Sequence, residues 1–179
     1  MNEEQDLERR RTAYRQSGLA VARYTQGRTV PDLSLDRPET PVAPERSIRA
    51  WEVDLGSRTR HQVELEIIAQ WAGPMAESRA CFEDREPPQG WGAAGELLAA
   101  LGRRVTRTAD ENDAYLEWLR RRALGLIEIP QIWAAIETLA AALLSRGTIP
   151  SVEASEIVAG VQRVARRRVG LAGFFRNPR

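Results

Sequence analysis

The side chains able to do metal chemistry are few in this chain. It contains one histidine, His61, and one cysteine, Cys81. Zinc sites in proteins use histidine, cysteine and carboxylate ligands, and most have at least two nitrogen or sulfur donors. The sequence therefore argues against a zinc site built within one chain, and it predicts no bound metal and no cofactor.

Other catalytic arrangements also lack their key residues. Apart from His61, every basic side chain is an arginine, which excludes Schiff-base lysines and the lysine of phosphate-binding loops. A serine triad would have to use His61, which lies in the polar run SRTRHQ, where a solvated histidine is expected. The acidic stretch DENDAYLEWL begins like a calcium loop, but alanine occupies the next ligand position. We interpret this stretch as the start of a helix.

The elements that must position the remaining polar residues are predicted to be helices. Apolar residues recur every three or four positions along most of the chain, which is the period of an amphipathic helix. The expected helices cover residues 4–26, 60–79, 93–105, 109–124, 130–146 and 151–168.

Two segments break this helical pattern, and a third ends the chain. Residues 31–47 contain four prolines, which block helix and predict a loop. Residues 48–55 alternate apolar and polar side chains, which predicts a small β element. We expect a flexible tail at residues 169–179. The predicted fold is mainly α, a single helical domain over residues 1–179.

Four separated segments resemble, in order, the protease domain of FtsH-like zinc metallopeptidases. The first, TAYRQSGLAVARYTQGRTV, is similar to the family helix T-A-Y-H-E-A-G-H-A-V-V. The second, ELEIIAQWAGPMAESRA, resembles I-x-x-x-L-A-G-x-A-A-E, and the third, GAAGELLAAL, resembles G-A-x-x-D-L-x-x-A. The fourth, IWAAIETLAAALLSRGTIPSVEASEIV, is similar to the closing helices. Together they span most of residues 12–158, and the resemblance implies that helical fold in a free-standing form.

The chain departs from this family at the positions that carry the chemistry. The resemblance places Arg15 and Leu19 at the two zinc-binding histidines, and Gln16 at the glutamate that acts as general base. An arginine offers no lone pair, a leucine has no donor atom, and an amide does not take a proton from water at neutral pH. Only Glu96, at the position of the third zinc ligand, keeps ligand chemistry. Peptide hydrolysis is therefore not expected.

Three further residues have expected structural roles. Arg15 is predicted to pair with Glu96, so that an ion pair replaces the metal bridge. Gly18 is expected to allow close packing of a neighbouring element, because a glycine inside a helix costs about 1 kcal/mol relative to alanine. Glu77 is expected to act as a structural partner.

The first functional interpretation is a non-catalytic, FtsH-like pseudo-peptidase that binds or regulates. Its ligand would be an unknown protein, peptide or small molecule. The alternative is a metal-independent enzyme with reassigned chemistry in the same pocket, for example in a biosynthetic pathway, and an active zinc peptidase ranks third. A net charge of +1 gives no field that favours nucleic acid, and no apolar stretch is long enough to span a membrane. We expect a cytoplasmic monomer or small homo-oligomer.

Overall fold

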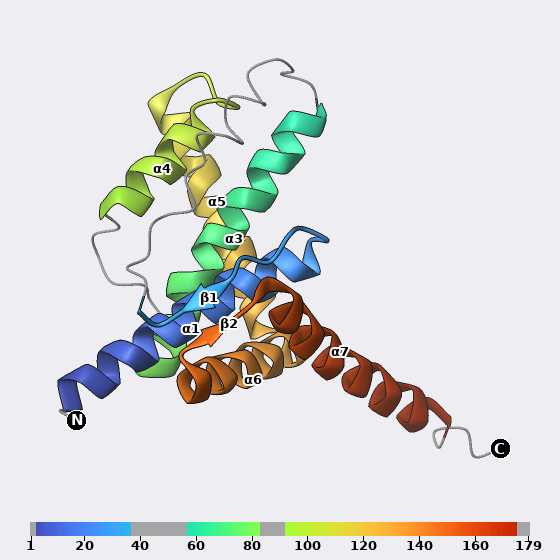
Figure 1. Ribbon diagram of the computed structural model, residues 1–179. Helices are drawn as coiled ribbons and strands as arrows, with labels where there is room; N and C mark the ends of the chain where they lie inside the picture. The colour runs from blue at the N-terminus through green and yellow to red at the C-terminus, as the bar shows by residue number, and fades with distance from the viewer. Residues whose placement is uncertain (1–2, 37–56, 83–91, 175–179) are drawn as a thin grey trace.

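A computed structural model describes residues 3–36, 57–82 and 92–174 of the chain. These residues form a mainly helical fold (Figure 1), as the sequence predicts. Its elements are α1 (Glu3–Thr25), β1 (Leu33–Ser34), α3 (Ser57–Cys81), α4 (Gly92–Gly102), α5 (Ala109–Glu128), α6 (Pro130–Arg146), β2 (Thr148–Ile149) and α7 (Ser151–Phe174). The β element expected at residues 48–55 and most of the proline-rich segment 31–47 lie outside the described residues.

The helices pack around a central pair, α1 and α3. These two helices make the most extensive contact in the fold, α6 lies along α1, and α5 lies along α3. The shorter α4 packs on α5, and α7 packs on α6 and extends away from the other helices (Figure 1). The core between them is mainly apolar, and its largest fully buried side chains include Ile67, Met75, Leu119, Ile136, Leu139 and Leu143.

Local sequence explains where several helices begin and end. Thr108 caps α5, because its side chain accepts a hydrogen bond from the backbone N–H of Glu111. Glu111 in turn accepts from the backbone N–H of Arg107, which completes a reciprocal cap. The acidic stretch at residues 110–113 therefore starts a helix, as predicted. At the end of α6, Gly147 adopts a φ of 77°, which a residue with a side chain rarely adopts.

Two short strands join the ends of distant segments. β1 and β2 pair antiparallel, with Leu33 opposite Ile149 and Ser34 opposite Thr148. Next to this pair, the carboxylate of Asp32 accepts a hydrogen bond from the backbone N–H of Ser151 and so caps the first turn of α7. β1 lies within the segment 31–47 that the prolines predicted to be a loop. Strands of two residues are too short for alternation to reveal them.

The end of the chain also differs from the prediction. α7 continues to Phe174, past the expected end at residue 168, so the segment predicted as a flexible tail begins as helix. Within the described residues, no single helix is both long and apolar enough to cross a membrane. Only the pair α5 and α6 meets the length and composition test together, and it is bent by 78°.

Candidate functional site

Three of the four positions that the resemblance assigned to a peptidase site, Arg15, Gln16 and Leu19, lie on α1 near its crossing with α3. Gly18 stands at this crossing: a Cβ atom added there would lie 2.5 Å from the carbonyl oxygen of Ala72 and 2.7 Å from the Cβ of Ala76. On the opposite helix, a Cβ added at Gly73 would lie 2.8 Å from the carbonyl oxygen of Arg15. Both glycines are therefore places where two backbones approach closely, which is the role expected for Gly18.

A fully buried carboxylate lies one turn from this crossing. Glu77 on α3 is 0% exposed, and it receives hydrogen bonds from two arginines of α1. The Nε of Arg11 donates to its Oε1 at 2.7 Å, and the Nε of Arg15 donates to its Oε2 at 2.5 Å. A buried carboxylate is stabilised by charged hydrogen-bond donors, and these two arginines supply them to Glu77 between the helices. The hydrogen bond that Arg11 donates to Glu77 also raises the pKa of Arg11.

The partner predicted for Arg15 was wrong. Arg15 pairs with Glu77, whereas Glu96 lies exposed on α4, and within the described residues no ion pair joins it to Arg15. The physical reason is the packing of α4, which lies against α5 and α3 rather than against α1. Residues 15 and 96, which the resemblance assigned to zinc ligands, are thus not paired in this fold. A carboxylate does neutralise Arg15, but it comes from α3.

Gln16, at the position of the family's general base, makes a pair of hydrogen bonds to one residue of β1. Its amide nitrogen donates to the carbonyl oxygen of Ser34 at 2.7 Å, and its amide oxygen accepts from the N–H of Ser34 at 2.9 Å. The other edge of β1 pairs with β2, and there the N–H of Leu35 donates to the carbonyl oxygen of Gly147. The side chain of Gln16 therefore acts like one residue of a third strand.

Leu19, which the resemblance aligns with the second zinc-binding histidine, packs against the apolar core. Its side chain is partly buried and lies against the core. Ser17, two residues before Leu19, is 0% exposed, and its hydroxyl has no hydrogen-bond partner among the described residues. This part of α1 therefore carries two arginine contacts, a strand-pairing amide and an apolar side chain.

A second buried carboxylate, which the sequence analysis missed, lies at the other end of the α1–α3 contact. Glu66 is 5% exposed, and its oxygens accept from Arg23 at 2.8 Å, Arg28 at 2.5 Å and Gln70 at 2.8 Å. Burial alone would raise the pKa of Glu66, but Arg23, Gln70 and Arg28 together lower it below its ordinary value. The signal was present, because Glu66 and Glu77 are eleven residues apart, close to three helical turns, and so share one face of α3.

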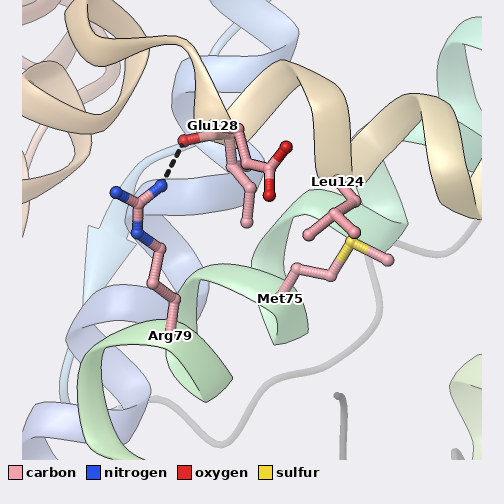
Figure 2. A pocket seen from close by; sticks show the side chains of 5 residues that line it. Met75, Arg79, Leu124 and Glu128 are labelled. Atoms are coloured by element: carbon pink, nitrogen blue, oxygen red, sulfur yellow. Dashed lines mark hydrogen bonds between the residues drawn. The ribbon is translucent and has the colours of Figure 1, made fainter. Parts of the chain in front are cut away.

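A small pocket lies between α3 and the end of α5 (Figure 2). Figure 2 shows Met75 and Arg79 of α3 facing Leu124 and the end of α5, where Arg79 donates to the carbonyl oxygen of Ile127 at 2.9 Å. The guanidinium of Arg79 also lies 3.9 Å from the ring centre of Trp133. The pocket has room for about one water molecule, so it does not fit a peptide or a small organic ligand.

The remaining candidate residues of the sequence do not form a reactive site. His61 is exposed and lies 4.0 Å from Glu64, which also accepts from the hydroxyl of Tyr115 at 2.7 Å. Burial, followed by this hydrogen bond, raises the pKa of Tyr115 to about 12, so it stays protonated. Burial also raises the pKa of the Cys81 thiol, which keeps it in its less reactive form. Among the described residues, no group of three or more His, Cys, Asp or Glu side chains is placed to hold a metal ion.

Comparison with known proteins adds no relative to this picture. No protein-family model, no curated protein and no solved structure matches the chain.

Proposed function

We propose that this chain is a non-catalytic, cytoplasmic binding protein whose peptidase-like positions carry structural side chains. The observation that carries the proposal is the amide of Gln16, which bonds both the N–H and the carbonyl oxygen of Ser34. A general base must present a free basic atom to a water molecule. Gln16 has no such atom, and both ends of its amide are occupied by backbone.

The residues beside Gln16 support the same interpretation. Arg15 is engaged with the buried carboxylate of Glu77, and Leu19 packs against the core. Neither side chain offers a lone pair to a metal or to a substrate. The same contacts count against a metal-independent enzyme built on Arg15, Gln16 and Glu96, because Glu96 is exposed on another helix.

The descent of this chain from FtsH-like peptidases is part of the proposal and rests on the four sequence segments. Two of those segments contain the glycines of the α1–α3 crossing, Gly18 and Gly73. A close helix crossing of this kind supports retention of a helical scaffold after its reactive positions changed. The non-catalytic part of the proposal does not depend on that ancestry, since it rests on what the side chains of Arg15, Gln16 and Leu19 contact.

The proposal is tested by zinc content and peptide hydrolysis in the purified full chain. We expect far less zinc than the one ion per chain of a catalytic site, and no hydrolysis of an unfolded protein substrate with or without added zinc. Gln16→Ala and Glu96→Ala serve as controls, because hydrolysis by a contaminating protease would persist in both. Stoichiometric zinc, or turnover that either substitution abolishes, would overturn the proposal.

A further inference from the structure

A row of flat side chains lies on the outer face of α5 and α3. The guanidinium of Arg60 lies 5.5 Å from the ring centre of Tyr115, the Tyr115 and Trp118 rings stack at 5.8 Å, and Arg122 lies 5.0 Å from the Trp118 ring centre. Trp118 is nevertheless 47% exposed. A tryptophan held in place by neighbours but open to water is typical of the anchor of an interface. We call Arg60, Tyr115, Trp118, Arg121 and Arg122 the Trp118 surface.

The Trp118 surface is basic at one end. Its carboxylates are already engaged, since Glu64 accepts from Tyr115 and Glu117 pairs with Arg120 and Arg121. Arg121 remains 74% exposed, and within the described residues no carboxylate pairs with Arg122. The opposite end is bordered by the acidic first turn of α5, at Asp110 and Glu111. A partner therefore fits best with its carboxylates against Arg121 and Arg122.

The beginning of α1 has the complementary chemistry. Residues 3–10 are all exposed, and the first turns of α1 extend past the neighbouring helices (Figure 1). Leu7 is 43% exposed there, preceded by the acidic residues Glu3, Glu4 and Asp6. We call Glu3, Glu4, Asp6 and Leu7 the acidic end of α1. Acidic residues in a first turn also favour the helix dipole, but the dipole does not explain the exposed leucine among them.

The spacing of charges on the two helices matches in one orientation only. Glu4 and Glu3 lie three and four residues before Leu7, and Arg121 and Arg122 lie three and four residues after Trp118. When two helices pack antiparallel with Leu7 on Trp118, the glutamates therefore meet the arginines. A parallel arrangement would instead place Arg10 and Arg11 of α1 against the same arginines, because these follow Leu7 at the same spacing.

We propose that the acidic end of α1 docks antiparallel on the Trp118 surface of a second copy of this chain. A single chain cannot make the contact within itself. Arg11 reaches Glu77 and Tyr115 reaches Glu64, and these two glutamates are thirteen residues apart on α3, about 20 Å along the helix. The two docking surfaces are different, so the contact closes a dimer if both chains make it reciprocally, and otherwise it is head-to-tail and builds rings or chains of subunits.

Sedimentation velocity of the full chain over a wide range of concentration tests this contact. The interface is small and charged, so association should be concentration-dependent, and raising the salt from about 0.05 M to about 0.5 M should weaken it. Trp118→Ala and Leu7→Ala should each abolish it. The matched control is Val152→Ala on α7, where an apolar side chain is 71% exposed, and this variant should associate like the unchanged chain.

Charge reversal separates this contact from every other one. Two double variants reverse the charges: one is Glu3→Arg with Glu4→Arg, and the other is Arg121→Glu with Arg122→Glu. Each should weaken self-association more than about tenfold, and mixing the two should restore association. A charge-matched control, Glu137→Arg with Glu156→Arg, changes exposed residues of α6 and α7 and should have no effect. Far-UV circular dichroism verifies that each variant is folded.

Three results would overturn the proposal. The first is a single species of monomer mass at low salt at every concentration. The second is association that survives Trp118→Ala and both charge reversals. The third is association lost in Val152→Ala, which would place the contact on α7. Recovery in the mixture cannot come from an unfolded variant, so the mixing experiment decides even if one variant is less stable.

Discussion

Arg15 of α1 and Glu77 of α3 form an ion pair across sixty-two residues of sequence, with the Arg15 Nε 2.5 Å from the Glu77 Oε2. Arg11 binds the other oxygen of the same carboxylate. At the far end of the helix pair, Arg23 and Arg28 share Glu66 in the same way. Two buried carboxylates of α3, each held by two arginines, therefore fix how α1 lies along α3.

Replacing the buried carboxylate of Glu77 should destabilise the fold. Glu77→Gln removes the negative charge and leaves Arg11 and Arg15 facing each other, with side chains that are 30% and 34% exposed. Breaking a buried pair costs about 3–5 kcal/mol, and the partial exposure of the arginines places this variant at the lower end, about 3 kcal/mol. Urea unfolding followed by circular dichroism measures the change in the free energy of unfolding.

The matched control for this variant is Glu8→Gln. Glu8 also pairs with Arg11, but its side chain is 64% exposed, so its loss should change the free energy of unfolding by less than about 1 kcal/mol. Equal effects of Glu77→Gln and Glu8→Gln would mean that the Glu77 contacts do not hold α1 against α3.

Adding a methyl group at Gly18 should force α1 and α3 apart. The new Cβ of Gly18→Ala would lie 2.5 Å from the carbonyl oxygen of Ala72, which is rigid backbone. Overpacking of this kind costs about 1–3 kcal/mol, and it opposes the gain of about 1 kcal/mol that alanine normally brings to a helix. Gly160→Ala on α7 is the control, because nothing lies within 4 Å of its added Cβ. We expect Gly160→Ala to raise the melting temperature and Gly18→Ala to lower it, and equal shifts would exclude a tight crossing.

The ion pairs of Glu66 should make stability depend on pH in the acid range. Although burial raises the pKa of Glu66, Arg23, Gln70 and Arg28 outweigh it and lower the pKa below its ordinary value near 4.5. The folded state therefore binds this proton less tightly than the unfolded state does. The contribution is present above about pH 4.5 and is lost as the pH falls through the folded-state pKa.

Urea unfolding at about pH 6 and at about pH 3 measures this dependence. The free energy of unfolding should fall with acidification more steeply in the unchanged chain than in Glu66→Gln, which has no carboxyl to protonate. Other carboxylates contribute to both proteins, so the difference between the two slopes isolates Glu66. Parallel slopes would show that Glu66 has the same pKa folded and unfolded.

Helices were predictable from the sequence because their signals are local. The expected helices at 109–124 and 130–146 begin where the structure places α5 and α6, at Ala109 and Pro130. The four apolar positions Val63, Ile67, Trp71 and Met75 recur every four residues and are all buried on α3. Such periodicity marks a face that must be covered, but it does not say which helix covers it.

Tertiary pairing was not predictable in the same way. Arg15 could have met either Glu77 or Glu96 on sequence grounds, and only the position of α4 against α5 excludes Glu96. The strand pair was missed because each strand has two residues, and because its third partner is a side chain, Gln16, rather than a strand. The resemblance predicts that position 16 has lost a catalytic group, whereas the partner that Gln16 has in the fold, Ser34, depends on where β1 lies.

The central claim is that Gln16 stabilises the fold and does no chemistry, and the unfolding free energy of Gln16→Ala tests it most directly. The substitution leaves the N–H and carbonyl oxygen of the half-buried Ser34 without their partners. We predict a loss of about 1–3 kcal/mol. Thr138→Ala is the control, because its hydroxyl bonds only the carbonyl oxygen of Ala134 at an exposed site of α6, and it should be nearly neutral. Unchanged stability of Gln16→Ala, or loss of a turnover that the unchanged chain possesses, would contradict the claim.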